Sequence, residues 1–133
     1  MDVASILLSE YARIIDGSRL LVVGTFNEIR TPRVPVTVQL FLSLVIEAHR
    51  DDRGKEHRGE LFVLNGKREE LTRLEVPFSF GDKDPKPGMF LKHTHLAAIQ
   101  IAFPEGGPYS FEFHIDGTYH AATNLYVIAA DEP

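Results

Sequence analysis

The chain has 133 residues, no cysteine and a formal net charge of −5. A length of this order is typical of one domain, so we expect a single domain over residues 1–133. The lack of cysteine excludes disulfides, thiolate catalysis and cysteine-bound zinc, and the negative balance argues against a nucleic-acid-binding surface.

The first part of the chain contains two strand patterns around a turn signal. Ile6–Ile15 and Leu20–Phe26 flank Asp16-Gly17, which predicts a hairpin. Asn27–Pro35 contains two prolines and is expected to be a crossing loop or a sheet edge, because proline cannot donate to a strand ladder. Met1–Tyr11 could be helical instead.

Val36–Ala48 is the longest clean strand pattern in the sequence. Its even-numbered residues are apolar throughout, whereas Gln39, Ser43 and Glu47 stand at odd positions. Because side chains on a strand alternate between faces, the even positions are expected to face the core. Phe41 and Val45 fall on the nominally polar face, which suggests that part of this face is covered.

A second hairpin is predicted after a charged loop at Arg50–Gly59. Glu60–Leu64 and Glu70–Phe80 flank the Asn65-Gly66 turn signal. Pro77 places the second of these strands toward a sheet edge. A single helical turn at Glu69–Leu74 is an alternative.

Three further strands are expected in the last third. They are Leu96–Phe103, Tyr109–Ile115 and about Tyr119–Ile128, preceded by a polar loop at Gly81–Gly88. Phe111, Phe113 and Ile115 hold the apolar parity of the clearest strand, and Asp116-Gly117 supplies a hairpin turn. The chain therefore predicts an all-β, antiparallel β-sandwich of about 7–8 strands.

A pattern of turns and core positions runs through the chain at Glu10-Tyr11-Ala12-Arg13-Ile14-Ile15-Asp16-Gly17, Leu20–Phe26, Thr31-Pro32-Arg33-Val34-Pro35, Phe103–Tyr109 and Asp116-Gly117. This pattern resembles a small bacterial family classed as a domain of unknown function. The resemblance implies an immunoglobulin-like sandwich and assigns no catalytic residues.

A weaker pattern is similar to the metal-binding motifs of cupins. His93 and His95 would point the same way on a strand, and His120 could complete a site from a neighbouring strand. However, Gln100 stands where that motif has a carboxylate ligand, and the strands that separate the two cupin motifs are missing. We therefore expect no metal, with His93 and His95 exposed at a loop–strand junction.

The remaining histidines depend on exposure and on register. His49 and His57 flank the charged loop and are expected to be solvated. A bulge in the last hairpin would keep Ala121, Leu125 and Val127 inward and set His114 opposite His120 on the outer face.

These observations favour a non-enzymatic module that associates with itself, most simply as a homodimer, or with another protein. Phe41 and Val45 are the predicted interface residues. A degenerate cupin-like metal site and a small-ligand or carbohydrate binder remain as alternatives. We expect no cofactor, no nucleic-acid partner and no membrane partner, since no apolar run approaches the ~18 residues of a span. The acidic start of the chain favours a cytoplasmic location.

Overall fold

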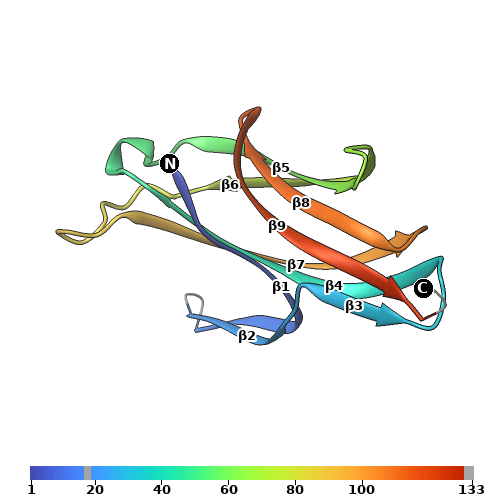
Figure 1. Ribbon diagram of the computed structural model, residues 1–133. Helices are drawn as coiled ribbons and strands as arrows, with labels where there is room; N and C mark the ends of the chain where they lie inside the picture. Colours follow the sequence, from blue (N-terminus) through green and yellow to red (C-terminus); the bar gives the residue numbers. More distant parts are fainter. Residues whose placement is uncertain (17–18, 131–133) are drawn as a thin grey trace.

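The computed structural model describes residues 1–16 and 19–130, and it consists mainly of strands in two sheets that pack face to face (Figure 1). Alternating apolar and polar residues produce this arrangement, because each strand buries one face. The elements are β1 (Asp2–Ile15), β2 (Arg19–Thr25), β3 (Glu28–Thr31), β4 (Val36–Ala48), the 3₁₀ turn η1 (Arg50–Asp52), β5 (Glu56–Asn65), β6 (Glu70–Ser79), β7 (Leu91–Phe103), β8 (Gly107–Ile115) and β9 (Thr118–Ala129).

One sheet has four strands in the order β2-β1-β4-β7, and the other has five in the order β3-β9-β8-β5-β6. Neighbouring strands are antiparallel except β3 and β9, which run parallel. The predicted all-β sandwich is thus confirmed. The described residues form nine strands because β3 adds an edge strand within the segment predicted as a crossing loop or sheet edge.

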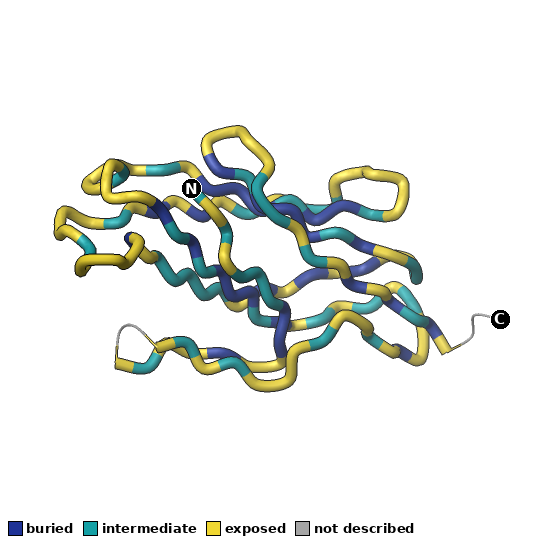
Figure 2. The backbone as a smooth tube through the Cα atoms, turned by 60° about the vertical axis from the view of Figure 1, so that its left-hand side comes forward, coloured by how far each residue is buried: buried dark blue, intermediate teal, exposed yellow. Residues whose placement is uncertain are grey.

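The core lies between the sheets and matches the predicted parity. Leu40, Leu42 and Leu44 from β4 are fully buried, as are Phe111 and Phe113 from β8, and Ile115 is 3% exposed. In Figure 2 the buried stretches follow the facing strands, and exposure gathers at the turns. The inward assignment of these two strands is therefore confirmed.

The predicted N-terminal and central hairpins, β1–β2 and β5–β6, are both present. β1 pairs with β2 from Ser9 to Ile15, although Gly17 of the predicted turn lies outside the described residues. β5 pairs with β6, and the Asn65 side chain accepts hydrogen bonds from the backbone N–H groups of Lys67 and Glu69. β6, which carries Pro77, is an edge strand as predicted.

Several predicted boundaries are wrong. β1 begins at Asp2, which also excludes the helical alternative for Met1–Tyr11. β5 begins at Glu56, within the predicted Arg50–Gly59 loop. β7 begins at Leu91 instead of Leu96, because polar histidines occupy inward positions and hide the apolar alternation. The segment Glu69–Leu74 enters β6 and forms no helical turn.

Candidate functional site

The outer face of the four-stranded sheet carries a continuous set of apolar side chains. The registers place Phe41 beside Ser9 of β1 and Ala98 of β7, and Val45 beside Ser5 and Thr94. We call this surface the apolar face. Its apolar members are Leu7 and Tyr11 (β1), Leu21 and Val23 (β2), Phe41 and Val45 (β4), and Leu96 and Ala98 (β7).

Both residues predicted at an interface lie near the middle of the apolar face. Phe41 and Val45 are half-buried. The rings of Phe41 and Tyr11 meet edge to face, with their centroids 5.6 Å apart. Tyr11 is 45% exposed and Val23 is 51% exposed. Exposed apolar patches that extend over several strands commonly mark interaction sites.

Charged residues on this side lie at the ends of the strands. Asp2, Glu47 and Lys92 pair in one row near the start of β1, and Arg13 and Arg19 lie in the β1–β2 hairpin, which turns back after Ser9 (Figures 1 and 2). Among the described residues, the rows between these ends contain only apolar, serine, threonine and glutamine side chains. The middle of the apolar face is therefore electrically neutral.

Ser43 lies between Phe41 and Val45 on β4. It is fully buried, and its hydroxyl has no hydrogen-bond partner within residues 1–16 and 19–130. A buried hydroxyl without a partner is unfavourable. Hence the Ser43 hydroxyl does not stabilise the sheet.

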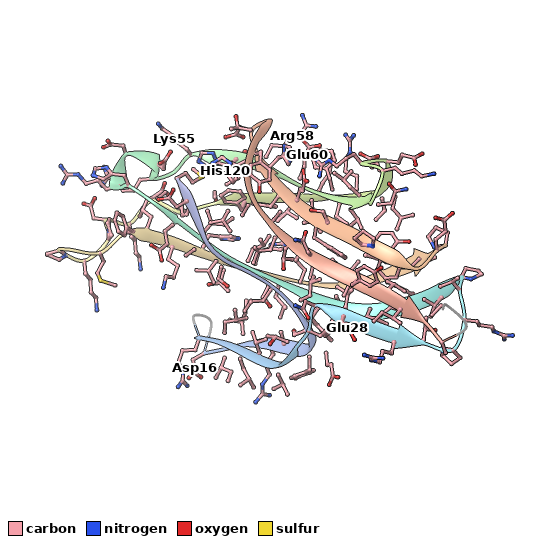
Figure 3. All side chains as sticks on the ribbon, in the orientation of Figure 1. Asp16, Glu28, Lys55, Arg58, Glu60 and His120 are labelled. Carbon is pink, nitrogen blue, oxygen red and sulfur yellow. The ribbon has the colours of Figure 1, made fainter. Side chains whose placement is uncertain are left out.

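The outer face of the five-stranded sheet has a different chemistry. Glu60 lies 3.1 Å from Arg58 and 3.5 Å from Arg73, and Arg68 donates two hydrogen bonds to the carboxylate of Glu112. The Arg68 hydrogen bonds are the main cause that lowers the pKa of Glu112, against the effect of burial. Figure 3 shows Arg58 and Glu60 near the top of the molecule, opposite Asp16 at the end of the β1–β2 hairpin.

His93 and His95 do not lie at a loop–strand junction, so that prediction is wrong. Both belong to β7, where they share the inner face with Ile99, and both are half-buried. The His93 ring stacks on Phe78 of β6 at 5.4 Å. Burial lowers the pKa of both histidines, and the neighbouring His95 lowers that of His93 further. Both rings are thereby favoured in the neutral form.

The prediction that His57 is solvated is wrong. Its side chain is 9% exposed, and its ring also stacks on Phe78, with the ring centroids 5.3 Å apart. Its Nδ1 donates to the Asp116 carboxylate at 2.8 Å, and the backbone N–H of Arg58 donates to the same carboxylate. These bonds lower the pKa of Asp116 and fix the β8–β9 turn to β5.

The last hairpin contains the predicted bulge, but the facing histidines do not form. The register shifts between Phe113 and His114, so Phe113 opposes Ala121 and His114 opposes Tyr119. His120 falls at the shift, and its Nδ1 lies 2.8 Å from the Thr118 carbonyl oxygen. The predicted bulge exists, but it begins only after the tight turn at Asp116 has paired His114 with Tyr119.

The three histidines of the cupin-like alternative do not share a sheet. His93 and His95 belong to the four-stranded sheet and His120 to the five-stranded one. Within the described part of the chain, no three His, Asp or Glu side chains are grouped so that they could hold a metal ion.

For a small ligand, the structure offers open hollows away from the predicted residues. One of about 640 Å³ is lined by the loop at residues 84–90 together with His49 and Arg50. Tyr109, one of the tyrosines that could stack on a sugar, is buried, and its hydroxyl donates to the Glu105 carbonyl oxygen.

Two packed sheets with an apolar outer face on one of them define an all-β sandwich. The chain belongs to the Family of unknown function (DUF6941), whose model matches residues 4–128. This confirms the resemblance to a family of unknown function, while the immunoglobulin-like detail, the bacterial origin and the cytoplasmic location stay predictions. No curated protein matches the chain. None of the helical segments in the described residues is long and apolar enough to cross a membrane.

Proposed function

We propose that this protein is a non-enzymatic β-sandwich module that forms a two-fold homodimer by burying the apolar face. The observation that carries the proposal is the neutral, apolar surface that extends over all four strands around Phe41 and Val45. Closed two-fold pairing is the commonest way for a chain to cover such a surface.

The apolar face alone is smaller than a standard interface. β1 pairs with β4 from Asp2 to Ser9 and with β2 from Ser9 to Ile15, so the part where strands lie side by side comprises β1, β4 and β7. Three strands about 4.8 Å apart, over about seven residues of about 3.3 Å, span roughly 330 Å². Since a standard interface buries ~800 Å² on each partner, rim residues around the apolar face must also contribute to the dimer.

The charges around the apolar face are compatible with a second copy as the occupant. Near the start of β1, Asp2, Glu47 and Lys92 form one row of mixed sign, and the rows that follow it around Phe41 and Val45 are neutral. A neutral centre with charges at the rim is the arrangement that protein interfaces commonly show.

Light scattering coupled to size exclusion tests the proposal at tens of micromolar protein. The wild type should have twice the 14.9 kDa mass of the chain. Phe41→Glu should return the mass to that of one chain, because a buried carboxylate without a partner opposes association. Tyr126→Glu is the matched control, since Tyr126 is an exposed tyrosine of β9 in the other sheet; it should leave the dimer intact.

A wild-type mass of 14.9 kDa at these concentrations would overturn the proposal. A dimer that survives Phe41→Glu and Val45→Glu but dissociates in Tyr126→Glu would place the interface on the five-stranded sheet. In either case Phe41 and Val45 would be ordinary half-buried surface residues.

A further inference from the structure

The free edge of β7 differs from the other sheet edges. β7 has 13 residues and pairs with β4 through every one of them without a register shift. It contains one lysine, Lys92, and no proline. By contrast, β6 carries Pro77, β3 has four residues, and β2 is interrupted by Gly24 at a φ of 71°. Long, flat and weakly charged edges are ready templates for another strand.

β7 crosses the opposite sheet at an angle. Near its start, His93 stacks on Phe78 of β6, and at its end Phe103 contacts Tyr109 of β8 at 4.8 Å. Since β5 lies between β8 and β6, β7 passes from a position over β6 to a position over β8. At the Phe103 end, the inner side of β6 therefore extends beyond the edge of β7.

Burial along the five-stranded sheet agrees with this geometry. Leu61 and Val63 of β5 are fully buried, whereas Leu71 and Leu74 of β6 pack against the core but remain half-buried. Leu74 is the direct partner of Leu61 in the sheet, so the two differ chiefly in what covers them. We call the partly covered inner side of β6 at Leu71 and Leu74, together with the unpaired backbone edge of β7, the wedge.

We propose that this wedge binds an extended segment of a partner protein, which adds a strand to the free edge of β7. The backbone of the segment pairs with β7, and its alternate side chains cover Leu71 and Leu74. The chemistry of the site fits an uncharged segment with alternating apolar and polar residues, because Leu71, Leu74 and the part of β7 from Ala97 to Phe103 carry no charged side chain.

A second folded copy does not fit the same edge. Pairing β7 with β7 of another molecule would extend the four-stranded sheets into one layer. The five-stranded sheet of each copy projects past β7 at the Phe103 end, so the two projecting layers would overlap. An isolated extended segment has no second layer and meets no such obstacle.

A phage-displayed library of random peptides of about twelve residues, which span roughly 40 Å when extended, tests the proposal. Peptides enriched on the wild type should alternate apolar and polar residues. As free synthetic peptides they should bind with an affinity that falls about tenfold or more in Leu74→Lys, equivalent to about 1.4 kcal/mol. Leu21→Lys on the apolar face is the matched control, and it should leave the peptide affinity unchanged.

Hydrogen exchange on the wild-type protein gives a second readout that needs no variant. A bound peptide should slow the exchange of every second backbone amide of β7 and leave β2 unaffected. Enrichment that is equal on Leu74→Lys, no enrichment at all, or protection of β2 in place of β7 would each overturn the proposal. These outcomes do not depend on the dimer. Phe41 lies outside the wedge, so the Phe41→Glu variant, which should be monomeric, should bind the same peptides.

Discussion

The two sheets bury one shared core but present different outer faces. On the five-stranded sheet, Glu60 and Glu112 are largely buried and are held by arginines of neighbouring segments. On the four-stranded sheet, the corresponding positions around Phe41 are apolar or small and neutral. Ion pairs keep the first face compatible with water, whereas the second has no comparable polar cover. The difference indicates which side of the molecule is available for association.

The largest expected effect concerns the core that both faces share. Phe113→Ala should lower the free energy of unfolding by about 3–5 kcal/mol, because it leaves a cavity between the sheets. Tyr119→Ala, at a side chain that is 55% exposed, should change it by no more than about 0.5 kcal/mol. Denaturant unfolding measures both. A loss below about 1 kcal/mol for Phe113→Ala would mean that the sheets do not depend on a common core.

The charged face can be tested through Glu112. Glu112→Ala should cost about 1 kcal/mol, since a charged hydrogen-bonded pair is lost but the Arg68 side is open to solvent and screened. Because the pKa of Glu112 is lowered from its ordinary 4.5, its contribution is present above that pH. The contribution disappears as the pH falls through the lowered pKa.

Glu112→Gln should therefore show a shallower loss of stability below about pH 4.5 than the wild type does. A double-mutant cycle with Arg68→Ala isolates the pair. Additive effects of the two changes would show that the pair does not stabilise this face.

The histidines at the inner side of β7 give a pH dependence in a higher window. The lowered pKa of His93 and His95 means that the unfolded chain binds protons first as the pH falls below about 6.5. Stability should then decrease, by less than about 1.4 kcal/mol per pH unit for each histidine. His93→Leu with His95→Leu should flatten this decrease in thermal unfolding, and His49→Leu at an exposed site should not. An unchanged slope in the double variant would contradict the burial of these rings.

The smallest expected effect belongs to Ser43, in the middle of the apolar face. Ser43→Ala removes a buried hydroxyl for which the described residues provide no hydrogen-bond partner. Stability should rise by up to about 1 kcal/mol, and the dimer mass should not change. A clear destabilisation would reveal a hydrogen bond to Ser43, supplied by a partner or by water, and the apolar face would then be less dry than its composition indicates.

Strand alternation made much of the fold predictable. Val36–Ala48 was predicted with the bounds of β4, and the inward set in β8 is confirmed. The start of β7 was missed because its inward positions at His93 and His95 are polar. The alternation of inward apolar residues therefore becomes continuous only from Ala97. Pairing partners such as the parallel β3–β9 contact depend on contacts far apart in sequence, which local patterns do not encode.

The candidate site was only partly visible in the sequence. Phe41 and Val45 stood out because they interrupt a polar series on a single strand. Leu7, Tyr11 and Leu96 were not recognised as their neighbours, since the register between β1, β4 and β7 decides which side chains share a face. The wedge at Leu74 could not be predicted, because it arises from the angle at which β7 crosses the other sheet.

The most direct test of the central claim is isotope-filtered nuclear Overhauser spectroscopy on a mixture of labelled and unlabelled chains. We expect contacts between the Phe41 ring of one copy and methyl groups of the other copy's apolar face, such as those of Val23, Val45 and Leu96. Intermolecular contacts that involve only the five-stranded sheet, or no intermolecular contacts at tens of micromolar, would contradict the account.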